Sequence, residues 1–213
     1  MVNYLLFGSI AYLLGSIPTA VWIGKTWYNI DVREHGSKNA GATNTFRVLG
    51  KKPGITVLVI DIIKGFLAVS IPVIFNLSGY FSYGLITNDE IIYLQILGAF
   101  AAVIGHVFPI FANFKGGKGV ATSLGVIIGI HPPAALLCVL LFLIIFISFQ
   151  FVSLGAICAS IAFPLTIIFV FEVKNVWLIV FSIILGSVVI LAHRKNIGRL
   201  MKGEESKMKL FKK

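Results

Sequence analysis

Long apolar runs separated by three short basic islands constrain this chain more than any other feature of its sequence. The islands lie within residues 25–52, 115–118 and 194–213. They hold all of the 18 Lys and Arg residues except Lys64 and Lys174. A charged side chain near the centre of a bilayer costs at least about 2.5–3.5 kcal/mol. We therefore expect the islands to lie outside the hydrocarbon and the apolar runs to enter it.

The composition is typical of a membrane protein. The mean hydropathy is +0.97 and 58% of the residues are hydrophobic, well above the values of soluble domains. About 20 apolar residues in a helix span a bilayer. Polar breaks divide the chain into seven apolar segments. These segments are residues 4–24, 54–75, 91–111, 120–131, 134–150, 152–170 and 176–192.

The positions of the charges predict the topology, because basic residues concentrate in cytoplasmic loops. We expect an all-α integral membrane protein with seven transmembrane helices, the N-terminus outside and the C-terminus in the cytoplasm. Residues 1–213 would form a single polytopic membrane domain, with cytoplasmic motif loops at 25–53, 114–119 and 193–213. Residues 120–131 are too short to span a bilayer unaided. Five spans plus a re-entrant segment are therefore the alternative.

Smaller features fit this topology. The run Gly15-Ser16-Ile17-Pro18 predicts a kink in the first helix, since proline removes a backbone donor, and its small residues permit close packing. Residues 76–90 contain no Lys or Arg, as an external loop should. The tail 207–213 is predicted to be a disordered or lipid-skimming basic end. The net charge of +10 is divided among loops beside the spans, which favours anionic lipid or phosphate over nucleic acid.

The first island contains a run of small and polar residues that ends in an arginine. Residues 35–47 read HGSKNAGATNTFR. Glycine lets the backbone approach a ligand closely, Ser, Thr and Asn add donors and acceptors, and Arg offers a fork for phosphate or carboxylate. An ordinary polar turn, capped by Ser37 or Asn39, is the alternative. The candidate ligand contacts are Ser37, Asn39, Gly41, Thr43, Asn44 and Arg47.

The second island is rich in glycine and precedes a predicted helix. Residues 114–122 read FKGGKGVAT. Glycine-rich backbone followed by a helix N-terminus is typical of an anion site. The run is not a Walker A loop, because Ala112 stands at the leading glycine and Gly119 at the Ser/Thr position. It predicts a phosphate contact without implying ATP, and a flexible basic loop is the alternative. The candidates are Lys115, Gly116, Gly117, Lys118 and Gly119.

The third island begins with a histidine at the end of the last apolar segment. His193 and Asn196 are three residues apart, so they would share a face if the helix continued. Histidine is a natural acid or base near neutral pH. A solvated histidine at the membrane surface is the alternative. Ser153, near the inner end of a predicted span, is either a ligand contact or a helix cap.

Three polar residues fall inside the predicted spans, where they are costly and therefore candidates for function. Asp61 and Lys64 are three residues apart on one helix face, and His106 lies near the end of the third segment. Asp61 and Lys64 either pair with each other to support packing or face the site. We expect a supporting position behind the ligand contacts.

The combination of these motifs resembles the bacterial acyl-phosphate-dependent glycerol-3-phosphate acyltransferases, the PlsY family. The resemblance covers essentially the whole chain, and the order of the motifs makes it specific. Two local departures are Ala156, where the family often has Ser, and Glu204, where Thr or Asn is commoner. The matching runs are residues 15–18, 36–44 with Arg47, 61–65, 105–109, 114–122 and 193–200.

The resemblance implies transfer of a fatty acyl group from acyl phosphate to glycerol 3-phosphate, the first step of bacterial phospholipid synthesis. It implies a multi-pass enzyme of the bacterial inner membrane whose site faces the cytoplasm. Its partners would be the two substrates and the lipid bilayer, and a membrane-associated enzyme that makes acyl phosphate is a candidate partner. Gly116, Gly117 and Gly119 would form the glycerol-3-phosphate loop, and Glu205 would be the family's tail glutamate. The implied catalytic residues are Ser37, Arg47, Lys118, His193 and Asn196.

The residues suit this chemistry. Acyl phosphate is a mixed anhydride with a good leaving group, so no covalent acyl-enzyme is required, and the sequence has no Gly-x-Ser-x-Gly elbow. Two phosphorylated substrates call for cations and backbone amides. The proton of the attacking hydroxyl goes either to His193 or to the substrate's own phosphate. We expect no cofactor and no metal site.

Two other functional classes stay open at this level. A transporter or channel for a phosphorylated small molecule would place polar groups across the membrane midplane, whereas here they gather toward one face. A structural membrane protein would account for the spans but not for the three islands.

Overall fold

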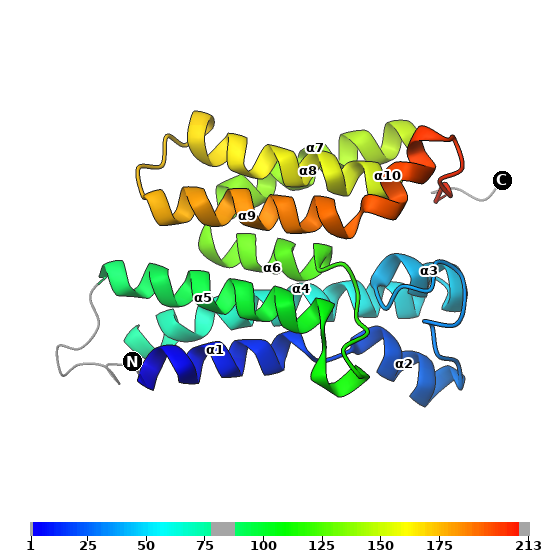
Figure 1. Ribbon diagram of the computed structural model, residues 1–213, viewed down its shortest axis with the longest axis horizontal. Coiled ribbons are helices and arrows are strands. Elements are labelled where there is room, and N and C mark those ends of the chain that lie inside the picture. Colours follow the sequence, from blue (N-terminus) through cyan, green and yellow to red (C-terminus); the bar gives the residue numbers. More distant parts are fainter. Residues whose placement is uncertain (1, 78–87, 209–213) are drawn as a thin grey trace. The chain divides into compact units, whose positions relative to one another are not determined.

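The computed structural model describes residues 2–77 and 88–208, and every element in these ranges is helical. The all-α prediction is therefore confirmed. The chain divides into two compact units, Met1–Ile130 and His131–Lys213, which we describe separately (Figure 1). The prediction of a single polytopic domain stays a prediction.

Unit 1 is built around four helices that run alongside one another, α1, α4, α5 and α6 (Figure 1). Helices α2 and α3 and the loop after α5 gather at one end of this unit. The first two basic islands therefore belong to the same end of unit 1. The elements are α1 (Val2–Gly15), α2 (Thr19–Tyr28), α3 (Ala42–Leu49), α4 (Lys51–Leu77), α5 (Asn88–Val107), the 3-10 turn η1 (Ile110–Ala112) and α6 (Val120–Ile130).

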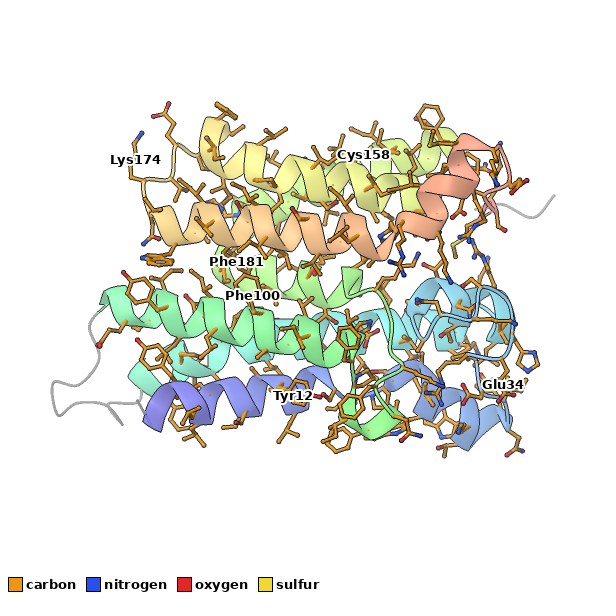
Figure 2. The ribbon with its side chains drawn as sticks, in the orientation of Figure 1. Tyr12, Glu34, Phe100, Cys158, Lys174 and Phe181 are labelled. Carbon is orange, nitrogen blue, oxygen red and sulfur yellow. The ribbon has the colours of Figure 1, made fainter. Side chains whose placement is uncertain are left out.

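The predicted kink in the first apolar segment is confirmed, because α1 ends at Gly15 and α2 begins at Thr19. The glycines nearby allow very close packing. A Cβ atom on Gly15 would overlap the carbonyl group of Ala102, and one on Gly105 would overlap the carbonyl oxygen of Tyr12. Helices α1 and α5 thus approach to a distance that only glycine permits. The Tyr12 hydroxyl also donates to the Phe108 carbonyl at 3.0 Å (Tyr12 is labelled in Figure 2).

Helix α6 is short but well supported within unit 1. It has 11 residues, fewer than a bilayer span needs. A Cβ atom on Gly125 would overlap the Ile62 carbonyl of α4, and one on Gly65 of α4 would overlap the Thr122 carbonyl of α6. Reciprocal glycines therefore bring the two backbones together, and α4 shields one side of the short helix.

Unit 2 contains three long helices and a short terminal one. His131 caps α7 by accepting from the Ala134 amide, and Asn175 caps α9 by accepting from the Leu178 amide. Phe163 and Phe181 pack edge to face, with ring centroids 6.3 Å apart. The elements are α7 (Pro132–Phe149), α8 (Val152–Leu165), the π-helical turn η2 (Thr166–Val170), α9 (Val176–Ala192) and α10 (Arg194–Met201).

The ends of unit 2 differ in character. Glu172 and Lys174 lie exposed in the connection between η2 and α9. In Figure 2, Lys174 marks the end of this unit opposite α10. The basic island of unit 2 therefore lies at the other end, beside the turn between α7 and α8.

All seven predicted apolar segments form helices, but fewer than seven of these helices are long enough to cross a membrane. Within the described ranges, five helical stretches are long and apolar enough to cross a membrane. A sixth arises if α9 and α10, bent by 60° at their junction, count as one. Seven spans and the orientation of the termini stay predictions.

The motif loops are more ordered than the sequence suggests. The segment 25–53 includes the end of α2, all of α3 and the start of α4, and the segment 193–213 includes α10. These helices lie within the predicted motif loops, whose cytoplasmic location stays a prediction. Of the predicted external loop 76–90, residues 78–87 lie outside the described residues, as do residues 209–213 of the tail.

Candidate functional site

Asn44 organises the loop of the first island. Its buried Nδ2 donates to the carbonyls of Val32, at 2.7 Å, and His35, at 3.1 Å, while its Oδ1 accepts from the Ser37 amide at 2.8 Å. These bonds occupy both ends of the side-chain amide. Asn44 thus positions the loop, and its predicted substrate contact stays a prediction.

The other predicted residues of this island lie on the loop and on α3. Ser37 is exposed and Asn39 is half-buried. Gly41 is the residue before α3, and its carbonyl accepts from the amides of Asn44 and Thr45. Thr43 lies in the first turn of α3, and Arg47 lies exposed in its last turn. A cation at this position interacts favourably with the helix dipole.

The glycine loop of the second island folds back on the end of α5. The amide of Gly116 donates to the Val107 carbonyl at 3.2 Å, and that of Gly117 donates to the His106 carbonyl at 3.1 Å. The structure thus uses these two amides to cap α5, where the sequence assigns them to a ligand. Lys115 is exposed and Lys118 is half-buried.

The helix predicted after the glycine loop is confirmed. Gly119 has a φ of +80°, a conformation that favours glycine. Helix α6 begins at the next residue, Val120, and the Ser123 amide donates to the Gly119 carbonyl at 2.7 Å. The first-turn amides of α6 therefore provide the helix N-terminus that an anion site needs.

Asp61, Lys64 and His106 form one buried cluster in unit 1. The Lys64 ammonium is 2.8 Å from the Asp61 carboxylate and donates to the Ile17 carbonyl at 2.9 Å. Thr19 donates to the same carboxylate at 3.1 Å, and His106 Nδ1 is 3.8 Å from it. Because Pro18 interrupts the helix beside Ile17, the cluster satisfies polar groups that the break exposes. It supports the fold at the base of the first island.

The cluster also reaches the glycine loop. A Cβ atom on Gly117 would overlap His106 Nε2, and one on Gly116 would lie 2.6 Å from Pro109 Cδ. The loop is therefore packed directly on the imidazole ring. His106 thus lies directly against the loop, and its supporting role behind ligand contacts stays a prediction.

Asp31 and Arg33 form an ion pair in unit 1. Neither residue is among the candidates predicted from the sequence motifs. Arg33 donates to the Asp31 carboxylate through Nε at 3.0 Å and through Nη2 at 2.8 Å. Lys25 adds an ion pair to Asp31 at 3.3 Å. The Arg33 hydrogen bonds hold the pKa of Asp31 well below its usual range, and the Asp31 carboxylate in turn raises the pKa of Arg33. An acid two residues before an arginine inside a basic segment is the signal that could have found them.

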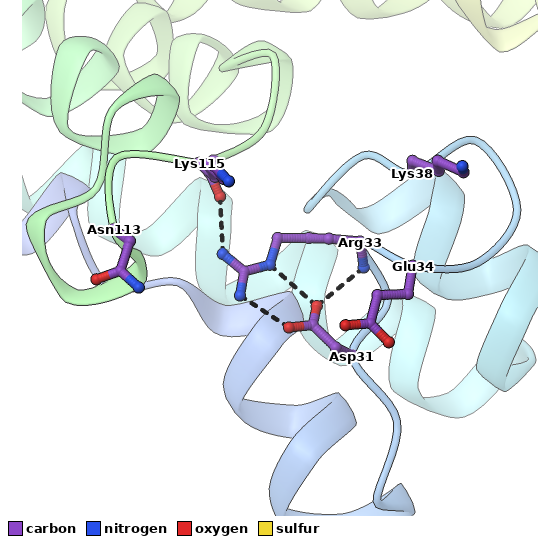
Figure 3. Close-up of a pocket in the computed structure, with 7 residues that line it drawn as sticks. Asp31, Arg33, Glu34, Lys38, Asn113 and Lys115 are labelled. Atoms are coloured by element: carbon purple, nitrogen blue, oxygen red, sulfur yellow. Dashed lines mark hydrogen bonds and ion pairs between the residues drawn. The ribbon is translucent and has the colours of Figure 1, made fainter.

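Asp31 and Arg33 line an open pocket of about 460 Å³ in unit 1, shown in Figure 3. That size lies within the range of small-molecule sites. Of the predicted ligand contacts, the pocket includes Lys115 and Gly116. The lining residues are Asp31, Arg33, Glu34, Lys38, Asn113, Lys115 and Gly116.

In unit 2, the tail glutamate joins three side chains from α8 and α10. The buried Glu205 carboxylate accepts from Ser153 Oγ at 2.7 Å, from Asn196 Nδ2 at 2.6 Å and from Arg199 Nε at 2.6 Å. Burial acts to raise the pKa of Glu205, but these three hydrogen bonds outweigh it and lower the pKa below its ordinary value. Glu205, the tail glutamate that the resemblance implies, therefore connects α8 and α10 within unit 2.

Two sequence interpretations in unit 2 need correction. Ser153 does not cap α8, whose N-cap is Phe151, and its hydroxyl donates to Glu205. A ligand contact by Ser153 stays a prediction. The helix that carries His193 does not continue straight to Asn196, since α9 and α10 meet at an angle of 60°. Both His193 and Asn196 are buried at this bend.

A hydrogen bond to the last turn of α9 orients the His193 ring. Its Nδ1 lies 2.8 Å from the Val189 carbonyl oxygen. A carbonyl can only accept, so Nδ1 carries the proton and the Nε2 atom of the neutral ring is an acceptor. The basic nitrogen of the neutral ring is therefore Nε2.

The C-terminal tail is ordered as far as it is described. The Met208 amide donates to the Gln150 carbonyl at 2.8 Å, and the Lys207 ammonium lies 5.4 Å from the centroid of the Phe151 ring. The prediction of a disordered tail is therefore wrong for residues 207 and 208. These contacts hold Glu205 against the turn between α7 and α8.

Comparison with known proteins agrees with the motif reading. The family model described as glycerol-3-phosphate acyltransferase matches residues 5–203. A glycerol-3-phosphate acyltransferase of Enterococcus faecalis is 45% identical over 206 residues, covering 93% of this chain and 89% of its own. One from Chlorobaculum tepidum is 41% identical over 236 residues and covers both chains fully, at 100%.

Solved structures give the same result. The glycerol 3-phosphate form of PlsY (YgiH), an integral membrane glycerol 3-phosphate acyltransferase, matches with a TM-score of 0.83 and 37% identity. The match covers 97% of this chain and 96% of that one. Its lysophosphatidic acid form matches with a TM-score of 0.79 and 36% identity, over 97% and 95% of the two chains. Sequence, fold and motif order converge, and this chain belongs to the glycerol-3-phosphate acyltransferase family.

Proposed function

We propose that this enzyme transfers a fatty acyl group from acyl phosphate to glycerol 3-phosphate and so begins bacterial phospholipid synthesis. The products are 1-acyl-glycerol 3-phosphate and inorganic phosphate. One observation carries the proposal: the chain matches, over 97% of its length, a PlsY solved with the acceptor and with lysophosphatidic acid, the product. Family membership over residues 5–203 supports the acyltransferase activity.

The chemistry needs few groups. The acceptor hydroxyl attacks the carbonyl carbon of the acyl phosphate, a new C–O bond forms, and the bond from that carbon to the phosphate oxygen breaks. Phosphate leaves with the electron pair, and the hydroxyl proton passes to a base. Cations stabilise the charge that develops, and we assign this role to Arg47 and Lys118, with Lys115 and the α6 N-terminus binding phosphate.

Ser37 and the residues around it provide the neutral contacts. Its hydroxyl is on an exposed loop whose backbone Asn44 fixes. Asn39, Gly41 and Thr43 lie on the same loop or at the start of α3. A loop held in one conformation before the ligand arrives loses less entropy on binding. Preorganisation by Asn44 therefore supports a substrate-binding role for this island.

His193 and Asn196 are assigned to the acceptor hydroxyl. The bond from Nδ1 to the Val189 carbonyl fixes the tautomer, and the bond to Glu205 fixes the Asn196 amide. Both side chains are thereby oriented by neighbours within unit 2, as a precise catalytic geometry requires. Their contribution is testable through the pH dependence of turnover, considered below.

The donor distinguishes this proposal from other acyl transfers. The purified protein is incubated with glycerol 3-phosphate and with either palmitoyl phosphate or palmitoyl-coenzyme A. We expect lysophosphatidic acid from the phosphate donor and none from the thioester. Product from the thioester alone would contradict the assigned donor while leaving the acyltransferase family intact.

We assign the enzyme to the bacterial inner membrane, with seven spans, the N-terminus outside and the motif loops in the cytoplasm. The positions of Lys and Arg support this orientation. Single cysteines placed at Lys52 and Lys174 test it in spheroplasts. An impermeant maleimide should label position 174 and spare position 52 until the cells are lysed, and the reverse pattern would overturn the topology.

A further inference from the structure

Arg33 connects the first basic island to the glycine loop. Its Nη1 donates to the Ala112 carbonyl at 2.9 Å and, in a longer contact of 3.4 Å, to the Lys115 carbonyl. These carbonyls lie at the end of η1 and at the start of the glycine loop. Figure 3 shows the guanidinium between Asp31 on one side and the Lys115 backbone on the other.

Asp31 fixes the guanidinium in place. The carboxylate accepts from Arg33 Nε, from Arg33 Nη2 and from the Arg33 backbone amide at 3.0 Å. The side chains of Arg33 and Asp31 are only 21% and 10% exposed. A bidentate pair of this kind is geometrically specific as well as charge-assisted. The arginine is therefore held as a rigid support for the loop carbonyls.

The Ala112 and Lys115 carbonyls belong to the backbone at the start of the glycine loop, so a donor to them restrains that backbone. Gly116 follows Lys115, and its amide already caps α5 through Val107. The loop is thus tied on one side to α5 and on the other, through Arg33, to the first island. Removing the second tie would take the Arg33 donor from the Ala112 and Lys115 carbonyls and so loosen the backbone around Lys115, while α5 and α6 stay intact.

We propose that Asp31 and Arg33 form a latch that positions the Lys115–Lys118 loop to receive the phosphate of glycerol 3-phosphate. The proposal rests on the proposed function. Arg33 is a positioning residue, because its donors are directed at Asp31 and at backbone carbonyls and the carboxylate beside it offsets its charge. The latch affects the affinity for glycerol 3-phosphate. It does not affect the affinity for the acyl donor or the rate of the chemical step.

The test compares Arg33→Lys and Asp31→Asn with the wild-type enzyme. Lysine keeps the charge of Arg33 but loses the planar fork, so both variants break the same geometry. We expect KM for glycerol 3-phosphate to rise about tenfold in each, the equivalent of one charge-assisted hydrogen bond. The value of kcat should stay within about twofold, and KM for palmitoyl phosphate should not change.

Two controls separate a latch from a general structural effect. Lys52→Met removes an exposed cation of the same island and should leave all three constants unchanged. The double variant Asp31→Asn/Arg33→Lys should be no worse than the worse single variant, because the two residues act as one unit. Where one variant fails to fold, the other still reports on the latch.

The outcomes are distinct. An unchanged KM for glycerol 3-phosphate in a folded variant overturns the latch, as does an equal rise in KM for both substrates. A wild-type enzyme that makes no lysophosphatidic acid overturns the proposed function and the latch with it. An active wild type with insensitive variants overturns the latch alone.

Discussion

At the residue scale, single buried side chains hold the proposed machinery in place. Asn44 fixes the first loop through three hydrogen bonds, and Glu205 holds Ser153, Asn196 and Arg199 together. Buried polar groups that are fully paired specify one geometry. Removing the shared acceptor at Glu205 would take a hydrogen-bond partner from the buried Ser153 and Asn196 side chains, and each buried polar group left unsatisfied costs about 1–3 kcal/mol.

The lowered pKa of Glu205 predicts an acid-sensitive contact. A carboxylate with a depressed folded-state pKa stabilises the fold fully above its ordinary pKa and loses that stabilisation as the pH falls through the folded value. We expect Glu205→Gln to lower the thermal midpoint of the purified protein at pH 7. The gap from wild type should narrow as the pH falls below about 4.

The neighbouring Glu204 provides the matched control. It is exposed, so Glu204→Gln should leave the midpoint unchanged at every pH. A gap between wild type and Glu205→Gln that stays constant from pH 7 into the acid range would show that the charge of Glu205 is not what stabilises the tail.

His193 supports a second prediction at this scale. We expect His193→Gln to reduce kcat by about 100-fold or more, the scale of general acid–base catalysis. If the ring is the base, the acid limb of the wild-type pH profile is lost in the variant. If the substrate's phosphate is the base, the limb persists at the lower rate. A folded variant with full activity would contradict a role for His193 in turnover.

At the element scale, the short helix α6 depends on glycine contacts. Helix α6 meets α4 where Gly125 faces the Ile62 carbonyl and Gly65 faces the Thr122 carbonyl. Since the opposing atoms are backbone, neither helix can relieve an added methyl by rotating a side chain. This packing positions the N-terminus of α6, and hence the end of the glycine loop.

We therefore expect Gly125→Ala to destabilise the protein by about 2 kcal/mol or more, as overpacking does, and to lower acyl transfer. Gly8→Ala on α1 is the control, because its Cβ would meet only the Leu97 side chain, at an ordinary 3.5 Å. Thermal midpoints of the two variants in the same detergent decide the question. Equal midpoints would contradict the close approach of α4 and α6.

The sequence predicts the helices well because hydropathy and helix length are local properties. Both the helix break at Pro18 and the short length of α6 can be predicted from the sequence. It does not predict helix α3, the bend at His193 or the ordered residues 207–208. These depend on contacts with residues distant in the chain, such as the Gln150 carbonyl that receives the Met208 amide.

At the scale of the whole molecule, the motifs predict the family better than they predict the contacts. The sequence shows which side chains in the islands could bind a ligand. It does not show which group each of these side chains contacts in the folded protein. Asn44, Ser153 and Glu205 have the right chemistry for a ligand and are used internally. The Arg33–Asp31 spacing is local, but the other partners of Arg33 are the backbone carbonyls of Ala112 and Lys115, which are 79 and 82 residues away in the sequence and cannot be recognised from it.

Under the proposed function, the three islands serve an enzyme that brings two phosphorylated compounds into one reaction. Two of them belong to one end of unit 1, and the third follows the last long helix of unit 2. A transporter for one of these compounds would bind it without consuming the other. The coupling of the two substrates is therefore the central claim.

Product stoichiometry in a single reaction tests that claim most directly. The purified enzyme is incubated with palmitoyl phosphate and labelled glycerol 3-phosphate, and lysophosphatidic acid and phosphate are measured together. The account predicts equal amounts of both products, and neither product above background when the acceptor is omitted. Phosphate release that does not depend on glycerol 3-phosphate, or uptake of the label into proteoliposomes without lysophosphatidic acid, would contradict it.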